Sequence, residues 1–218
     1  MRLDKFISTT TTLSRAEAKK IIKKGVLINN ILVKSPDYKV DELSDQVIVN
    51  GERLVYQKYI YIMMNKPKNV VSATEDAVEK TVVDILEEKD RIHKVFPVGR
   101  LDKDTEGLML LTNDGELAHK LISPKKDVEK KYYVEVSGEL KEEHIKLIKD
   151  GLTIDGGYKC KSARLEILES SKERSRAYIF ITEGKFHQVK RMMKSLATTV
   201  TYLKRLSIGT LILDENLK

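Results

Sequence analysis

After residue 59, six segments have the composition and alternation of β-strands, and several of them follow one another with no helix between. These segments are 59–64, 108–112, 131–136, 163–168, 177–182 and 200–203. Four other segments have helical spacing of their apolar residues, namely 81–88, 116–122, 142–149 and 187–196. A doubly wound sheet needs a helix after each strand. The observed order therefore predicts an α+β domain with a mixed, mainly antiparallel sheet.

The first 34 residues form a separate and strongly basic segment. They contain eight Lys and Arg residues and two acidic residues, in a chain whose formal net charge is +7. Ser14 followed by Glu17 has the pattern of a capping box, which predicts the start of a helix, and Gly25 is typical of a helix end. Two strand-like segments, 26–28 and 31–33, come next and predict a hairpin.

This segment resembles the RNA-binding domain named after ribosomal protein uS4. The matching stretches are Arg2 to Phe6, Ser14 to Ala18 and Lys24 to Asn29. The resemblance implies a small helix-plus-hairpin S4-like domain over 1–52, a linker over 53–59 and a larger domain over 60–218. Candidate RNA-binding residues in the small domain are Arg2, Lys5, Arg15, Lys19, Lys20 and Lys23. The alternative is a solvated lysine face, which is the usual role of a run of charges.

The composition as a whole suits a polyanionic partner. The pI is near 9.2, and such an excess of cations favours binding to phosphates, although a merely soluble surface carries the same sign of charge. The single cysteine, Cys160, cannot form an internal disulfide and indicates a reducing compartment. The N-terminus lacks the apolar run of a signal peptide, and no stretch approaches the ~20 apolar residues of a membrane span. We therefore expect a cytoplasmic protein.

The most informative segment runs from Pro97 to Gly115. A polar loop, Gly99-Arg-Leu-Asp-Lys-Asp-Thr-Glu-Gly107, leads into a short apolar strand and an Asn-Asp-Gly turn. Loops carried by a rigid strand are common positions for reactive groups. Asp102 lies between an arginine and a lysine, and nearby cations favour the charged form of a carboxylate. From these residues alone, a surface loop held by salt bridges is an open alternative.

The same run resembles the signature of a bacterial family of ribosomal RNA pseudouridine synthases, in which Gly-Arg-Leu-Asp carries the catalytic aspartate. The match continues past the tetrad through the apolar strand to Gly115. The resemblance implies that Asp102 is the nucleophile, and Arg100 beside it is a candidate RNA contact. Arg2 to Lys5 repeats the letters of Arg100 to Lys103 but lacks the preceding glycine and the following strand. No catalytic role is therefore expected for Asp4.

The alternating segment 129–136 contains two adjacent tyrosines. The family places an active-site tyrosine after a Lys-x pair, which corresponds to Tyr132. Its ring can stack on an extruded base, and its hydroxyl can assist a proton transfer. Tyr133 faces the opposite side of the strand because side chains alternate. The alternative for Tyr132 is a half-buried strand tyrosine without a chemical role.

A third segment, 185–205, contains six Lys and Arg residues and no acidic residue, and it begins with an amphipathic helix. From composition alone this helix either contacts phosphates or is solvated. The resemblance implies that Lys190, in a His-Gln-x-basic motif, pairs with the catalytic aspartate, and Arg191 is the second choice. Lys185 and Arg191 are candidate RNA contacts, and His187 is expected to be structural.

Two further fragments are similar to the same family. Asn65-Lys66-Pro67 with Val70-Val71-Ser72 resembles the opening of the catalytic domain, and Arg205 to Gly209 resembles its closing strand. Asn69 stands where the family usually has glycine, and asparagine also tolerates positive φ.

The family resemblance implies isomerisation of a flipped-out uridine to pseudouridine in ribosomal RNA, with no cofactor and no metal. The four histidines show no metal-ligand spacing. The run Ser123-Pro124-Lys125 followed by Glu129 to Tyr132 is closest to the small-subunit (16S) enzyme. A large-subunit (23S) target is the alternative. We expect a monomer that acts on 16S rRNA or on a small-subunit assembly intermediate. The rival from another class is a non-catalytic RNA-binding assembly factor.

Overall fold

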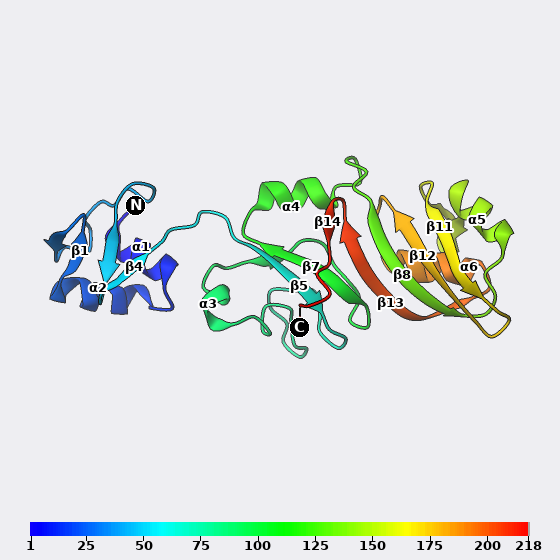
Figure 1. The fold of residues 1–218 in the computed structure, drawn as a ribbon, viewed down its shortest axis with the longest axis horizontal. Coiled ribbons are helices and arrows are strands. Elements are labelled where there is room, and N and C mark those ends of the chain that lie inside the picture. Colours follow the sequence, from blue (N-terminus) through cyan, green and yellow to red (C-terminus); the bar gives the residue numbers. More distant parts are fainter. Residues whose placement is uncertain (218) are drawn as a thin grey trace. The chain divides into compact units, whose positions relative to one another are not determined.

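A computed structural model describes residues 1–217, and the chain divides into two compact units (Figure 1). The first unit comprises residues 1–60 with 85–95, and the second comprises 61–84 with the chain from 96 onward. Each unit has a sheet of its own. None of the helices in the described part of the chain is both long enough and apolar enough to cross a membrane.

In the first unit, two helices and a small antiparallel sheet share one apolar core. The elements are α1 (Leu3–Thr10), α2 (Arg15–Lys24), β1 (Val26–Ile28), β2 (Ile31–Val33), β3 (Val47–Val49) and β4 (Glu52–Leu54). The capping box is present, because Glu17 N donates to Ser14 Oγ at 3.3 Å and Ser14 N donates to Glu17 Oε2 at 2.8 Å. The predicted basic helix and hairpin are confirmed. Since β4 pairs with β3, the small sheet extends into the segment expected as a linker.

Asp4, the aspartate of the first Arg-Leu-Asp-Lys copy, is completely buried at the start of α1. Arg2 Nε lies 3.1 Å from its Oδ1 and Arg15 Nε lies 3.1 Å from its Oδ2, while Lys19 Nζ lies 4.0 Å away. The hydrogen bond from Arg2 is the largest cause that lowers the pKa of Asp4 to about 2. Asp4 therefore organises three of the cations that the sequence proposes as RNA contacts.

The second unit is built on one large mixed sheet in the order β11-β12-β8-β13-β7-β5, in which only β7 and β13 pair in parallel among the described strands. Its strands are β5 (Tyr61–Lys66), β6 (Phe96–Pro97), β7 (Glu106–Thr112), β8 (Lys130–Ser137), β11 (Arg164–Ser170), β12 (Arg174–Ile181), β13 (Thr199–Ile208) and β14 (Leu211–Ile212), with a separate pair β9 (Thr153–Ile154) and β10 (Tyr158–Lys159). The helices are α4 (Gly115–Ile122), α5 (Glu142–Lys149) and α6 (Gln188–Ser195), besides a short 3-10 turn, η1 (Asp155–Gly157). The expected α+β class with a mainly antiparallel sheet is confirmed.

The parallel pair β7 and β13 brings two backbones unusually close at Gly107. A Cβ added to Gly107 would lie 2.2 Å from Arg205 O and 2.8 Å from Arg205 N, and the φ angle of this glycine is +99°. Only glycine fits both the contact and the backbone angle without strain. The glycine that ends the polar loop is therefore required where the loop joins the sheet.

The prediction of a helix over 81–88 is wrong. This segment forms turns, and the helix α3 (Glu88–Arg91) begins only at its last residue. Thr81 pairs with Val71 in a parallel bridge, and Val82 N donates to Val71 O. Asp84 Oδ2 accepts from both the amide and the hydroxyl of Thr81 at 2.8 Å. The apolar spacing that suggested a helix instead buries Val82 and Leu86 from an extended and turning backbone.

Candidate active site

The loop that carries Asp102 lies between β6 and β7 and is fixed by residues from the preceding segment. Ser72 Oγ donates to Leu101 O at 2.8 Å and accepts from Leu101 N at 3.0 Å. Asn69 has a φ angle of 64°, as the sequence suggested, and its backbone N–H donates to Lys103 O at 2.8 Å. These bonds hold the backbone on both sides of Asp102, so its carboxylate projects from a rigid support.

Lys66 is a second support for this loop, and it is completely buried. Its Nζ donates to three backbone carbonyls, those of Pro67 at 2.9 Å, Thr105 at 2.9 Å and Lys103 at 3.3 Å. Burial lowers the pKa of this ammonium to about 8, against the opposing effect of the loop carboxylates. Lys66 thus connects the end of β5 to the backbone of the loop that carries Asp102.

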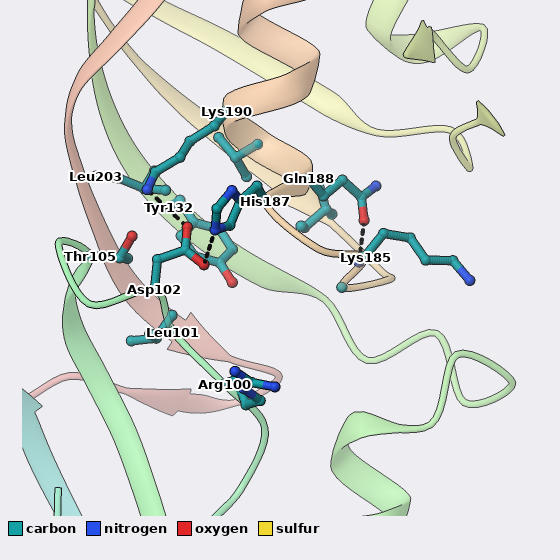
Figure 2. Close-up of a pocket in the computed structure, with 13 residues that line it drawn as sticks. Arg100, Leu101, Asp102, Thr105, Tyr132, Lys185, His187, Gln188, Lys190 and Leu203 are labelled. Carbon is teal, nitrogen blue, oxygen red and sulfur yellow. Dashed lines mark hydrogen bonds and ion pairs between the residues drawn. The ribbon is translucent and has the colours of Figure 1, made fainter. Parts of the chain in front are cut away.

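The carboxylate of Asp102 lies between a lysine and a histidine (Figure 2). Lys190 Nζ is 2.9 Å from Asp102 Oδ2, and His187 Nε2 is 3.4 Å from Asp102 Oδ1. About a quarter of the Asp102 side chain is exposed, 26%, so the group is sheltered but reachable. The pairing that the sequence assigns to Lys190 is present in the structure, and His187 is a second group in contact with the carboxylate.

Lys190 is shared with a second carboxylate, because its Nζ also lies 2.6 Å from Asp104 Oδ1. Burial lowers the pKa of Lys190, but the hydrogen bonds to Asp104 and Asp102 outweigh it, and the pKa is raised overall. For Asp104, burial raises the pKa, but the hydrogen bond and the charge of Lys190, with smaller contributions, together outweigh burial, and the pKa is lowered overall. Lys190 therefore stays charged, and it keeps a permanent cation beside Asp102.

Tyr132, on β8, faces the same hollow as Asp102 and is 8% exposed (Figure 2). The hollow has about 420 Å³ of empty space and is open to solvent. Leu203, on the neighbouring strand β13, contributes an apolar wall. Tyr133 lies on the other face of β8, where its ring contacts Tyr178 and Tyr202 edge-on. The structure thus brings together Asp102, Tyr132 and Lys190.

The segment before α6 is locked by a buried amide. Gln188 Nε2 donates to Glu183 Oε1 at 2.6 Å, and Gln188 Oε1 accepts from Lys185 N at 2.8 Å. His187, which precedes α6, has a left-handed backbone with φ at 48°. Arg191 turns away from Asp102, since its guanidinium pairs with Asp155 and donates to Asp155 O at 2.6 Å. The choice between the two adjacent cations therefore falls on Lys190.

A wider groove continues from the hollow and gathers positive charge. It has about 1260 Å³ of empty space, and its lining includes Arg100, Lys103, Lys185 and the exposed ring of Phe186. Arg100 and Lys185 point away from the Asp102 carboxylate (Figure 2). Their positions suit contacts with a long anionic ligand whose reacting part lies in the hollow. The other RNA-binding candidates, from Arg2 to Lys23, lie in the first unit.

Sequence reasoning missed three parts of this site. Asp104 gave no signal of its own beyond being one acidic residue in a charged loop, and Lys66 was noted only as part of a resemblance. His187 was recognised in the His-Gln motif, but its contact with Asp102 and its left-handed backbone, uncommon for residues other than glycine, were not predicted.

The arrangement is suited to chemistry on a planar ligand. A carboxylate in contact with Lys190 can attack an electrophilic carbon or take a proton, and the ring of Tyr132 offers a stacking surface. The groove beyond is cationic, so the remainder of the ligand is expected to be anionic.

Comparisons with known proteins agree with this geometry. The profile of the RNA pseudouridylate synthase family matches residues 60–195, and that of the S4 domain matches residues 1–47. An uncharacterized RNA pseudouridine synthase of Bacillus subtilis, YtzG, is 47% identical over 100% of this chain and 91% of its own length.

Two further relatives have names that specify a ribosomal subunit. Ribosomal small subunit pseudouridine synthase A of Haemophilus influenzae is 36% identical, covering 100% of this chain and 93% of that protein. Ribosomal large subunit pseudouridine synthase B of Bacillus subtilis is 37% identical, covering 94% of this chain and 84% of that protein. A crystal structure of a pseudouridylate synthase superposes with a TM-score of 0.68 at 35% identity, covering 100% of this chain and 93% of the other.

Proposed function

The chain belongs to the RNA pseudouridylate synthase family and is an isomerase that acts on RNA, and from this premise we propose that it converts a uridine of 16S ribosomal RNA to pseudouridine with Asp102 as nucleophile. The observation that carries the proposal is the Asp102 carboxylate, 2.9 Å from Lys190 Nζ, in a hollow that Tyr132 also lines. The alternative, a non-catalytic RNA-binding assembly factor, disagrees with membership of a family of enzymes.

The proposed reaction needs nothing that the RNA and these side chains do not supply. The bond between uracil N1 and the ribose carbon breaks, a bond from uracil C5 to the same carbon forms, the proton on C5 leaves, and N1 ends protonated. Asp102 acts on the flipped nucleotide, Lys190 pairs with its carboxylate, and Tyr132 holds the base and assists proton transfer. Flipping costs a few kcal/mol, which contacts between flanking RNA and the cationic groove offset.

The proposal also specifies which ribosomal RNA carries the target uridine. The run Ser123-Pro124-Lys125 and the segment from Glu129 to Tyr132 support a 16S target, and a relative named for the small subunit is 36% identical. The second candidate is 23S rRNA, because a relative named for the large subunit is 37% identical. Pseudouridine should be mapped on 16S and 23S transcripts after incubation with the protein, by chemical labelling and primer extension. A new stop in 16S alone is expected, and a stop only in 23S would replace the first candidate by the second.

Replacing Lys190 with methionine should reduce the rate of pseudouridine formation at saturating RNA at least about hundredfold, because Asp102 loses the cation that stabilises its charge. Single-turnover rates measure this effect. Lys194→Met removes the same charge from an exposed position on the same helix and serves as the control. Lys190→Arg is expected to recover part of the rate. Equal rates for the Met variants at 190 and 194 would contradict the role of Lys190.

The first unit is expected to supply non-specific RNA affinity through α2. Changing Lys20 and Lys23 to alanine should weaken binding and reduce the slope of log affinity against log salt by about two, since each lost phosphate contact removes roughly one unit. Fluorescence anisotropy over a salt series measures the slope. The matched control, Lys146→Ala with Lys149→Ala, removes two charges from the exposed face of α5. Identical slopes for the two double variants would show that the α2 lysines are only a solvated face.

A further inference from the structure

A second hollow lies next to the Asp102 hollow, and its lining contains two buried cations. It has about 480 Å³ of empty space and is lined in part by Lys130, Arg205, Tyr132 and Arg100. Both hollows include Arg100, Tyr132 and Gly184 in their walls. They are therefore adjacent spaces that meet at the ring of the active-site tyrosine.

Strand register explains why these cations converge. Lys130 and Tyr132 lie two residues apart on β8 and share one face, since side chains alternate along a strand. Arg205, on β13, is the direct antiparallel partner of Tyr132 and lies on that same face. Burial lowers the pKa of Lys130, and the positive charge of Arg205 lowers it further.

Neither cation has a carboxylate partner among the described residues. Lys130 is 7% exposed, and its Nζ reaches only Thr182 O at 3.5 Å. Arg205 is 4% exposed; its Nε donates to Leu108 O at 2.8 Å, and its Nη2 is buried with no hydrogen-bond partner. Buried charges are normally paired, because an uncompensated ion in the interior is expensive. An anion bound in this hollow would compensate both groups.

The acidic groups nearby are not paired with these two cations. Glu183 also lines the hollow, but it forms no ion pair with Lys130 or Arg205, and its oxygens accept from Tyr158 OH at 2.6 Å, from Gln188 Nε2 at 2.6 Å and from Lys161 N at 2.9 Å. Asp127 attracts Lys130 only at longer range, since its Oδ1 is paired with Lys161 Nζ at 2.6 Å. Neither buried cation is therefore paired with one of these carboxylates.

We propose that this Lys130–Arg205 hollow binds a phosphate group of the RNA next to the target uridine. The inference rests on the proposed function, because the phosphate belongs to the nucleotide whose base lies in the Asp102 hollow or to its neighbour. A neutral base does not compensate two full positive charges, whereas a phosphodiester carries a negative charge and several acceptor oxygens. Tyr132 separates the base on one side from the phosphate on the other.

The test compares Lys130→Met with Lys131→Met. Lys131 is the adjacent residue on β8, and its ammonium lies 3.7 Å from the centre of the Tyr178 ring on the opposite face, so both variants lose the same charge. Anisotropy with an rRNA fragment that contains the target should show a salt slope smaller by about one and an affinity lower by roughly tenfold for Lys130→Met only. Equal slopes for the two variants would overturn the phosphate site.

A second measurement separates binding from folding. Without RNA, Lys130→Met should melt at or above the temperature of the parent protein, because an uncompensated buried charge is gone. Inorganic phosphate should raise the melting temperature of the parent and of Lys131→Met but not that of Lys130→Met. A phosphate response that survives in Lys130→Met would also overturn the proposal. Should the methionine variant fail to fold, Lys130→Gln takes its place in both measurements.

The proposed function is tested apart from this site by mapping pseudouridine with the parent protein. If the parent modifies no rRNA while the difference in salt slope persists, the proposed reaction is wrong and the phosphate site stands. If pseudouridine forms and both methionine variants bind alike, the reaction stands and the phosphate site is wrong.

Discussion

Asp102→Ala should make no detectable pseudouridine, a loss of at least about four orders of magnitude, while its affinity for RNA stays within about twofold of the parent value. The carboxylate is the reacting group in the proposed mechanism, and neither Lys190 nor His187 can replace its attacking oxygen. RNA affinity is expected to persist because the cations of the groove and of the first unit are untouched. Product is measured by chemical labelling and primer extension under single-turnover conditions.

The matched control for this change is Asp104→Ala. Asp104 also contacts Lys190 Nζ, at 2.6 Å, but 69% of its side chain is exposed against 26% for Asp102. Without the Asp104 carboxylate, Lys190 pairs with Asp102 alone. The rate of pseudouridine formation should therefore change by less than about tenfold. Activity retained by Asp102→Ala, or lost equally in both variants, would contradict the assignment of the nucleophile.

Gly107→Ala should destabilise the second unit by more than about 3 kcal/mol, because the new Cβ meets Arg205 O at 2.2 Å and the backbone angle of +99° is strained for alanine. The two nearest atoms belong to the backbone of the paired strand β13, so moving a flexible side chain cannot relieve the contact. Urea unfolding followed by far-UV circular dichroism, with the transition of the second unit fitted by itself, measures the loss.

Gly115→Ala is the control for the change at Gly107. Its added Cβ has nothing within 4 Å, and Gly115 begins α4, where alanine is the better helix former. The control should unfold at the same urea concentration as the parent or slightly above it. Equal midpoints for the two variants would show that β7 and β13 adjust to the extra methyl group, and that the close contact is not required.

Local patterns in the sequence predict the elements whose hydrogen bonds and contacts are made between residues close together in the chain. The Ser14–Glu17 capping box, the hairpin after α2 and the helix over residues 142–149 depend on contacts within a few positions, and all three are present. The segment 81–88 has helical spacing too, but its backbone bonds to Val71 instead. Tertiary hydrogen bonds decided that conformation, and no local pattern contains them.

The candidate site shows the same division. Family motifs identified Asp102, Tyr132 and Lys190, whose meeting point in the structure depends on three separate elements. The contact of His187 with Asp102 and the buried hydrogen bonds of Lys66 join residues far apart in the chain, so no local sequence pattern predicts them. The unpaired state of Lys130 and Arg205 is visible only once β8 and β13 lie side by side.

The strand order makes β13 the element that completes the sheet during synthesis of the chain. β7 and β8 are synthesised first, yet they never pair with each other, because β13 lies between them (Figure 1). The loop with Asp102 is attached to β7 and Tyr132 belongs to β8, so a nascent chain shorter than about residue 199 holds both halves of the site without a link. Under the proposed mechanism, we expect the site to form only when β13 pairs with both strands, in one late and non-local step of folding.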